Sequence, residues 1–361
     1  MLILTIVFIL VNVVQHDIFW EPMSRLAEMD KVVVVADVFQ AGGRGGPVAV
    51  RRDLEQTEPS VLADLLGAIA ALDLEHVHYR NPSELAQHAS THKADVILSI
   101  YGGERSRNRM LLTPAVCETF GLAYVGLDAF GRALAQDKEA SKMLARSCGL
   151  LTPRARVIRR AEELHICTEF PAPYVVKPLH EGSSIGISQE NLIHNPLDGV
   201  RLAASLLQRF DQPVLVESFV AGREISFTAV ETEAGLAMRL AEIVVDGQPD
   251  YFVTRLFDAE EKLRRLLPRR AARVSDDLVA NVDWDAAYRL LRAIGHFGYA
   301  RIDGRVVGNR FHFIELTPDA FIGPLGQMAA GFIGSDTTYT DFIGLVLHSA
   351  VLRPRDQSAS G

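Results

Sequence analysis

The sequence predicts an α/β protein whose first part is a doubly wound parallel sheet and whose later part is α+β. Up to about residue 127, apolar strand segments alternate with helical segments, which is typical of a parallel sheet. After Pro153 the expected strands follow one another at short intervals, as in hairpins. With 361 residues, 48% of them hydrophobic, the chain is long enough for two or three packed subdomains.

The expected strands of the first part are apolar runs at residues 2–10, 31–39 and 94–101. The run at 2–10 is interpreted as a strand because it is shorter than the roughly 20 residues that span a bilayer. It also lacks the preceding basic residues of a signal peptide. Helical spacing over residues 60–74 predicts a helix with Ser60 as its N-cap. Residues 112–128 predict a helix followed by a short strand.

The later part begins with a helix over residues 137–149 that ends near Gly149. Further helices are expected at 284–295 and 338–352. The polar, basic segment 258–278 is expected to be mobile. The expected strands are residues 155–158, 173–177, 214–219, 224–230, 239–245, 298–303 and 311–316.

Composition narrows the classes of partner. The formal net charge of −8 disfavours nonspecific nucleic-acid binding, which needs a basic surface. The three cysteines, Cys117, Cys148 and Cys167, show neither a metal-binding spacing nor a disulfide framework, which favours a reducing cytoplasm. We therefore expect a cytoplasmic protein with no nucleic-acid and no membrane partner.

The segment "PYVVKPLHEGSSIGIS", residues 173–188, changes from an apolar strand to a loop of small polar residues. Lys177 ends the strand, where a buried ammonium needs an anionic partner. The loop with Glu181, Ser183 and Ser184 offers flexible backbone and hydroxyl donors, which suit phosphate oxygens. The segment therefore predicts a phosphate-binding loop.

A second candidate site is the predicted hairpin of residues 298–303 and 311–316, with a turn around Gly308-Asn309. If the turn centres near Asn309, Asp303 lies opposite Glu315 and Arg301 opposite Thr317. Facing carboxylates repel each other unless a cation lies between them, and oxygen ligands suit Mg²⁺. The alternative is two acids on the solvent face of the hairpin, and the hairpin alone does not decide between the two.

Other charged residues have two interpretations each. Glu217 ends an apolar run and could accept a hydrogen bond from an amine, and Glu224 could accept a ribose hydroxyl pair. Without context, both are better explained as charges that flank the turn at 221–222. Lys138 and Lys142, four residues apart, form either a solvated helix face or a face from which Lys138 reaches a phosphate.

Taken in order, these pieces resemble the ATP-grasp superfamily, and within it the D-alanine–D-alanine ligase branch, over about residues 121–318. "ALAQDKEASKMLARSCGLLTP" is similar to the branch's helix with a phosphate-contacting lysine, and "VVKPLHEGSSIGIS" to its phosphate loop. "VLVESFVAGREISF" is similar to its adenosine-binding hinge, and "ARID…FIELTP" to its metal-binding hairpin.

The resemblance implies an ATP-grasp fold with three parts. These are an N-terminal α/β domain (1–127), a central subdomain (128–216) and a C-terminal subdomain with the metal site (217–361). It also implies ATP and one or two Mg²⁺ ions as cofactors. The nucleotide-binding residues would be Lys138, Lys177, Glu181, Ser183 and Ser184 at the phosphates, Glu217, Phe219 and Val220 at the adenine, and Glu224 at the ribose. Asp303, Glu315 and Thr317 would hold the metal, and Arg301, Arg255 and Ser184 would form the catalytic set.

The activity implied by the resemblance is that of an ADP-forming carboxylate–amine ligase, which makes an amide bond through an acyl phosphate. Two departures bear on the substrates. Thr317 stands where the branch has Asn, and "DYFVTR" has Thr254 where the branch has a lid lysine, with Arg255 next to it. The beginning, with "HDIFWEPMSRL", looks more like ligases that make small metabolites such as mycosporine-like amino acids.

We therefore expect amino-acid-type substrates in small-metabolite biosynthesis, with a homodimer left open. The alternatives are a cell-wall D-alanine–D-alanine ligase and a non-catalytic nucleotide-binding module. The basic residues between 262 and 273 would frame a lid over the phosphates, or form an ordinary solvated helix.

Overall fold

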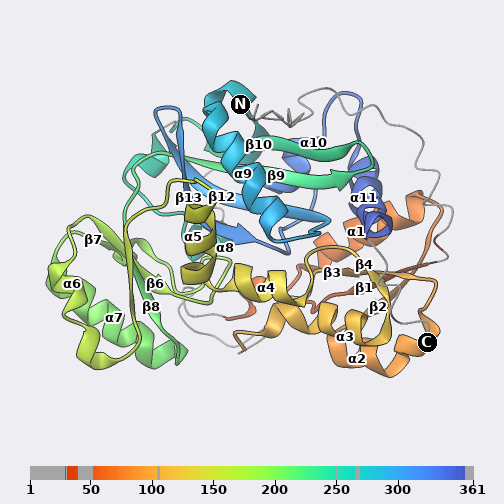
Figure 1. Cartoon of the computed structure of the whole chain (residues 1–361), viewed down its shortest axis with the longest axis horizontal. Coiled ribbons are helices and arrows are strands. Elements are labelled where there is room, and N and C mark those ends of the chain that lie inside the picture. The colour runs from red at the N-terminus through yellow and green to blue at the C-terminus, as the bar shows by residue number, and fades with distance from the viewer. Residues whose placement is uncertain are drawn as a thin grey trace, which may run out of the picture.

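The computed structural model describes residues 29, 31–39, 52–103, 106–248, 250–264 and 269–353. The strand expected at 2–10 and the segment "HDIFWEPMSRL" lie outside these residues. Within the described part, the strands form three sheets, each with its own helices (Figure 1). The arrangement matches the expected parallel sheet followed by an α+β region.

The first sheet is parallel, with strand order β2-β1-β3-β4. Val32 and Val34 pack on the side of α1, and Val33 and Val35 pack on the side of α2 and α3, because side chains alternate along a strand. The elements are β1 (Lys31–Val35), α1 (Pro59–Ala71), β2 (Glu75–Tyr79), α2 (Pro82–His88), β3 (Val96–Ser99), α3 (Leu112–Phe120) and β4 (Ala123–Tyr124).

The N-cap of helix α1 lies two residues earlier than predicted. Glu58 is its N-cap residue and makes no side-chain cap, and Pro59 is the first helical residue, so the prediction of Ser60 as N-cap is wrong. The ring of Pro59 fixes a backbone angle that suits the first helical turn, and proline has no N–H that would need a cap.

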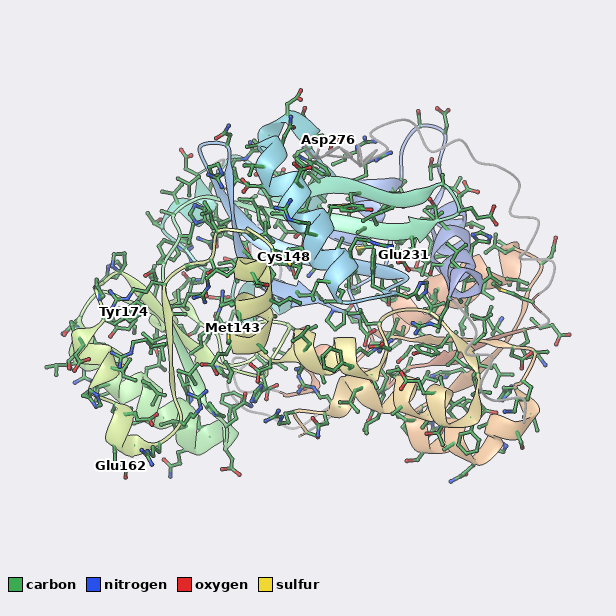
Figure 2. All side chains as sticks on the ribbon, viewed as in Figure 1. Met143, Cys148, Glu162, Tyr174, Glu231 and Asp276 are labelled. Atoms are coloured by element: carbon green, nitrogen blue, oxygen red, sulfur yellow. The ribbon has the colours of Figure 1, made fainter. Side chains whose placement is uncertain are left out.

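The second sheet is antiparallel, with order β5-β8-β6-β7, and lies at the left of Figure 1. Tyr174, labelled in Figure 2, is fully buried on this sheet and donates a hydrogen bond to the carbonyl of Cys167. A side chain at Gly199 of α7 would collide with the Tyr174 hydroxyl, so the helix can approach this closely because that residue is glycine. The elements are β5 (Ala155–Ile158), α6 (Ile166–Glu169), β6 (Tyr174–Pro178), β7 (Leu192–Ile193), α7 (Pro196–Phe210) and β8 (Val214–Ser218).

The third sheet is antiparallel, with order β11-β10-β9-β12-β13. Apolar residues of α4, α5 and α9 share one core with β9, β10, β12 and β13. The elements are β9 (Arg223–Thr232), β10 (Gly235–Val245), β11 (Arg269–Arg273), β12 (Tyr299–Val307) and β13 (Arg310–Thr317), with α4 (Ala129–Gln136), α5 (Lys138–Ser147), α8 (Ala259–Arg264), α9 (Asn281–Ala293), α10 (Gln327–Phe332) and α11 (Tyr339–His348).

Two regular elements lie within the segment 258–278, whose expected mobility stays a prediction. Residues of α8 are helical, and β11 pairs with β10 in an antiparallel ladder from Ala241↔Arg273 to Val245↔Arg269. Pairing with β10 satisfies one side of the β11 backbone and leaves the β11 arginines on the edge strand, where charged side chains are common.

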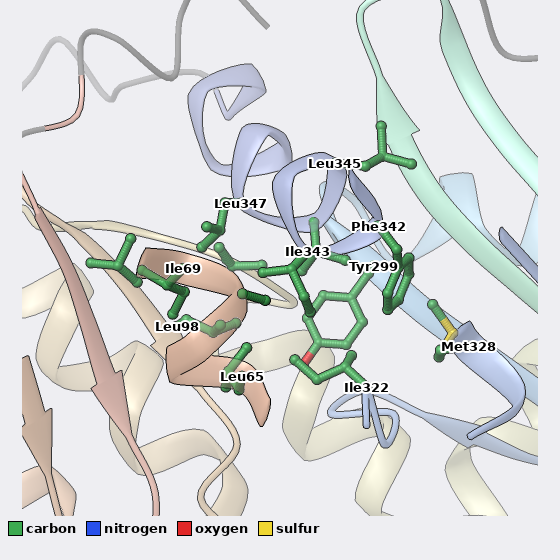
Figure 3. Close-up of a cluster of buried hydrophobic side chains, with 14 of the residues drawn as sticks. Leu65, Ile69, Leu98, Tyr299, Ile322, Met328, Phe342, Ile343, Leu345 and Leu347 are labelled. Carbon is green, nitrogen blue, oxygen red and sulfur yellow. The ribbon is translucent and has the colours of Figure 1, made fainter. Parts of the chain in front are cut away.

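One apolar cluster joins the first sheet to the end of the chain (Figure 3). Leu65 and Ile69 of α1 pack with Phe342 and Ile343 of α11, and Tyr299 of β12 belongs to the same cluster. The first and third sheets therefore share one continuous apolar core.

The subdomain boundaries at 127/128 and 216/217 stay predictions. The first falls just before α4, and the second falls inside β8. No helix among the described residues is long and apolar enough to cross a membrane.

Candidate active site

Two adjoining cavities lie where the three sheets meet. The smaller, of about 150 Å³, is lined by residues of β6, β8, β9, β12 and β13. The larger, of about 870 Å³, extends toward α1 and the loop at 318–326. The residues that line both cavities are Lys138, Glu181, Gly182, Phe257, Lys262, Arg301, Glu315 and Gln327.

Lys177, at the end of β6, has an anionic partner within the protein. Its ammonium lies 2.8 Å from Oε1 of Glu217 on the neighbouring β8, and Lys142 of α5 pairs with the other oxygen. Burial raises the pKa of Glu217, but the two ammoniums outweigh it and hold the pKa below its ordinary value. Burial also lowers the pKa of Lys142 to about 8, although Glu217 opposes this shift.

Lys138 and Lys142 do not form a solvated helix face. Both are buried, whereas their neighbour Met143 lies on the exposed side of α5 (Figure 2). The Lys138 ammonium donates to the carbonyl of Glu181 and lies 3.5 Å from Oε2 of Glu315. Lys138 therefore connects the phosphate-loop segment to the predicted metal hairpin.

The loop after β6 turns through left-handed backbone at Ser183 and Ser184, with φ of 47° and 59°. The Gly182 N–H donates to Oε1 of Glu55, and the Ser184 hydroxyl donates to the carbonyl of Phe257 at 2.7 Å. The loop is therefore tied to the connection between β1 and α1 on one side and to the segment before α8 on the other.

Glu181 is held by side chains from two other parts of the chain. Arg109 lies 3.2 Å from its Oε2, and Gln212 donates to its Oε1 at 2.7 Å. Arg109 also donates to Oε2 of Glu55 through Nε, at 2.8 Å. Glu55 and Arg109 were not among the predicted residues, because they are 54 positions apart and belong to no local motif.

The predicted register of the hairpin is confirmed, with Arg301 opposite Thr317 and Asp303 opposite Glu315. Arg301 donates to both oxygens of Asp303, at 2.5 and 2.9 Å. Ser226 and Thr317 donate to Oδ1 and Oδ2 of the same carboxylate. Burial raises the pKa of Asp303, but Arg301 and these hydroxyls outweigh it and keep the pKa below its ordinary value. Because Asp303 and Glu315 both line the smaller cavity, they are not acids on an outer solvent face.

Arg305 holds the segment 219–224 that follows β8, which we call the hinge. This residue was not predicted from the sequence. Its Nε donates to Oε2 of Glu224 and its Nη1 to the carbonyl of Val220, both at 2.8 Å. Its guanidinium lies 4.9 Å from the centroid of the Phe219 ring. The alternation that places Arg301 and Asp303 on one face also includes Arg305, and this was the available signal.

Arg255 is exposed and lies over the ring of Tyr251, at 5.0 Å from its centroid, and it lines neither cavity. Its catalytic role stays a prediction. Lys262 of α8 lines both cavities instead, and burial lowers its pKa although Glu315 opposes the shift. The side chains of residues 263–268 lie outside the described part of the chain.

Asp319 follows the hairpin and lines the larger cavity, where its carboxylate pairs with the buried Arg132 of α4. Burial raises the pKa of Asp319 to about 6, against the opposing effect of Arg132. A raised carboxyl pKa in a cleft is typical of functional sites, although structural ion pairs also produce it.

The residues present fit a divalent cation that shares its ligands with a nucleotide. Asp303 and Glu315 face each other across adjacent strands and line the same cavity. Within the described residues, no group of three or more His, Cys, Asp or Glu side chains could hold an ion alone. Mg²⁺ usually binds through one or two carboxylates together with phosphate oxygens and water, which matches this pair.

Comparison with known proteins gives consistent matches. A protein-family profile described as "D-ala D-ala ligase C-terminus" matches residues 148–318. A D-alanine–D-alanine ligase of Gloeobacter violaceus is 33% identical over 208 residues, which cover 56% of this chain and 64% of the relative. One of Syntrophotalea carbinolica is 32% identical over 241 residues, which cover 65% and 73%.

Solved structures match over most of the chain. The D-alanine–D-alanine ligase of Bacillus anthracis in complex with ATP aligns with a TM-score of 0.66 at 14% identity, covering 89% of this chain and 98% of that one. The VanG D-Ala:D-Ser ligase of Enterococcus faecalis aligns with a TM-score of 0.63 at 16% identity, covering 89% and 99%. These likenesses confirm the predicted fold class.

Proposed function

The chain belongs to the D-alanine–D-alanine ligase family of ATP-grasp enzymes, and on this basis we propose that it is an ADP-forming ligase. It would join the carboxylate of one amino-acid-type substrate to the amine of another. One observation carries the proposal. Four charged residues line both the smaller and the larger cavity, and they are suited to phosphoryl and acyl transfer. They are Lys138, Lys262, Arg301 and Glu315.

In this proposal ATP occupies the smaller cavity. Lys138 and Lys177 contact its phosphates, and the loop with Glu181, Ser183 and Ser184 covers them. Glu217, Phe219 and Val220 line the adenine end, and Glu224 accepts from the ribose. Lys142 and Lys177 support this placement. Their two ammoniums share the one carboxylate of Glu217, which leaves one positive charge to attract a phosphate.

The chemistry we propose starts when a substrate carboxylate in the larger cleft attacks the γ-phosphate, giving an acyl phosphate and ADP. The amine of the second substrate then attacks the acyl carbon, and phosphate leaves. Arg301 faces both cavities, so its guanidinium is placed to stabilise the oxyanion of the second step. Asp303 and Glu315, with Thr317, would hold Mg²⁺, which supplies positive charge against the phosphate oxygens.

Thr317 donates to Asp303 at 2.7 Å, so its hydroxyl orients this carboxylate in addition to its proposed contact with a metal. We add Lys262 to the residues proposed to contact the phosphates. Its charge lies beside Arg301, Asp303 and Glu315, where a γ-phosphate would be transferred.

For the substrates, we propose amino acids other than two D-alanines, in small-metabolite biosynthesis. Asp319 supports this, because a carboxylate at the cleft wall would select a substrate that carries a further donor. The second candidate is D-alanine with D-alanine or D-serine, which is favoured by the names of the relatives. We further propose a cytoplasmic location, which the three free cysteines support, and a homodimer as one assembly to test.

The test is ATP-dependent phosphate release with pairs of D- and L-amino acids, followed by mass spectrometry of the product. Arg301→Met should lose product formation, and Arg156→Met, which breaks an exposed pair with Glu169, should retain it. Release with D-alanine alone would favour the second candidate. ATP binding without release for any pair would leave a non-catalytic nucleotide-binding module.

A further inference from the structure

Arg305 of β12 joins three separate parts of the chain through one guanidinium. Its Nε donates to Oε2 of Glu224 at 2.8 Å, at the start of β9. Its Nη1 donates to the carbonyls of Val220 and Phe252, each at 2.8 Å. Its Nη2 donates to the carbonyl of Arg255 at 2.9 Å. The side chain is 6% exposed, so these contacts replace its hydration.

The arrangement needs an arginine in particular. The planar guanidinium offers donors in a fixed fork that reaches four acceptors in different directions, whereas a lysine has three donors on one atom. The face of the guanidinium also lies 4.9 Å from the ring centroid of Phe219 and 5.7 Å from that of Phe252. Stacking on aromatic faces stabilises a buried cation further.

The residues that Arg305 holds belong to two segments that contribute to the wall of the smaller cavity. Val220 and Glu224 line it themselves. Phe252 and Arg255 belong to the segment 250–257, which contains the short 3₁₀ helix η8 (Tyr251–Val253). The last two residues of this segment, Leu256 and Phe257, also line the cavity. We name this segment the cover.

The smaller cavity, which Leu256 and Phe257 of the cover help to line, has about 150 Å³, whereas pockets that take drug-sized ligands have about 300–1,000 Å³. A nucleotide held in this cavity alone would therefore need the cover to move outward. Two of the four hydrogen bonds of Arg305 end on the cover, at the carbonyls of Phe252 and Arg255, and the other two end on the hinge. Movement of the cover therefore breaks or reforms bonds to Arg305.

We propose that Arg305 is a positioning residue that couples nucleotide binding to closure of the cover. With Oε2 of Glu224 held by Arg305, the other oxygen of this carboxylate is left to accept from a ligand hydroxyl. Closure of the cover restores the bonds to Phe252 and Arg255 above the bound nucleotide. The proposal rests on the proposed function, since it takes ATP as the ligand of this cavity.

The test compares Arg305→Met, Arg305→Lys and the control Arg223→Met. Methionine keeps an apolar stem against Phe219 but has no donors, and lysine keeps the charge. Arg223 lies on β9 next to Glu224, but its guanidinium pairs with Glu242, its side chain is 44% exposed and it lines neither cavity. The probes are AMP-PNP with MgCl₂ in calorimetry, and amide hydrogen exchange of residues 250–257.

In the wild type, AMP-PNP should slow exchange in the cover. Arg305→Met should weaken AMP-PNP binding about tenfold or more, as expected for the loss of a charge-assisted hydrogen bond, and should remove the protection of the cover. It should raise KM for ATP and leave KM for the amino-acid substrates unchanged, a split that a merely structural role would not give. Arg305→Lys should recover part of both effects, and Arg223→Met should match the wild type.

Wild-type affinity and wild-type protection in Arg305→Met would overturn the role of Arg305 while leaving the proposed function standing. Absence of AMP-PNP binding to the wild type would instead overturn the proposed function, and this role with it. If Arg305→Met fails to fold by circular dichroism, Arg305→Lys decides. If Arg305→Lys has the AMP-PNP affinity and the protection of the cover of the wild type, the fork geometry of arginine is not needed, and the proposal is overturned.

Discussion

The Lys177 ammonium lies 2.8 Å from Oε1 of Glu217, and the two side chains come from neighbouring antiparallel strands, β6 and β8. Since Lys142 pairs with the other oxygen, one carboxylate is shared by two buried lysines. The three groups together carry one positive charge. An anionic ligand in the smaller cavity would offset this charge.

The first prediction concerns stability. Glu217→Gln removes the carboxylate and leaves two buried ammoniums without an anionic partner. We expect the free energy of unfolding to fall by about 3–5 kcal/mol, measured by urea denaturation. The matched control is Glu169→Gln, which breaks the exposed pair with Arg156 and should change stability by less than about 1 kcal/mol. Equal effects of the two substitutions would contradict the shared-carboxylate arrangement.

The second prediction concerns ATP. Lys177→Met keeps the aliphatic stem and leaves Glu217 paired with Lys142, so the fold should be retained. ATP affinity should fall by about tenfold or more, because a charge-assisted contact to phosphate is lost. Isothermal titration calorimetry measures this change, with Arg156→Met as a surface control. A folded variant with unchanged affinity would rule out a phosphate contact for Lys177.

The third prediction concerns Glu315, whose side chain is 31% exposed, so that Glu315→Gln should fold normally. Turnover should fall on the order of 100-fold, because an amide cannot neutralise charge at a cation, and extra Mg²⁺ should rescue it weakly. Phosphate release at several Mg²⁺ concentrations measures this. Glu75→Gln, at a surface pair with Lys31, is the control. Normal turnover of Glu315→Gln in limiting Mg²⁺ would show that the facing carboxylates do not hold the ion.

The fourth prediction concerns pH. The folded-state pKa of Asp319 is raised to about 6, first by burial, so the folded protein binds this proton more tightly than the unfolded chain. The resulting stabilisation is full below the unfolded pKa of about 4 and is lost as the pH rises through 6. Asp319→Asn cannot titrate. The stability of the wild type minus that of Asp319→Asn should therefore fall by about 2 kcal/mol between pH 4.5 and pH 7.5. A difference that stays constant with pH would refute the raised pKa.

The sequence predicted the hairpin register correctly, but for an incomplete reason. The turn residues Gly308 and Asn309 pair Val307 with Arg310, and this count alone would not place Asp303 opposite Glu315. The register shifts between Asp303 and Gly304, where a β-bulge leaves Ile314 of β13 without a partner on β12 and so adds the missing residue. A side chain at Gly304 would collide with the carbonyl of His312, so glycine permits the bulge. Bulges depend on such close approaches, which strand alternation does not reveal.

The contacts that the sequence did not predict come from residues far apart in the chain. Arg305 bonds Glu224 and Val220, 81 and 85 positions away, and Arg109 bonds Glu55. Glu224 lies directly opposite Arg305 on the paired strand β9, and Glu55 and Arg109 lie in two short 3₁₀ helices, η3 (Arg52–Glu55) and η5 (Arg109–Leu111). Only the folded chain brings each of these pairs together. The solvated-face interpretation of Lys138 and Lys142 was wrong, since Lys142 pairs with Glu217 of the second sheet and Lys138 lies 3.5 Å from Glu315 of the third.

The apolar cluster that joins α1 to α11 also sets an order of events during synthesis of the chain. Leu65 and Ile69 leave the ribosome well before Phe342 and Ile343, which cover them in the finished protein. At about 5–20 residues per second, the roughly 270 intervening residues take on the order of 14–54 s to synthesise. During that interval this apolar face of α1 has no partner in α11. The first sheet can thus form early, but it reaches its final packing only after α11 has left the ribosome.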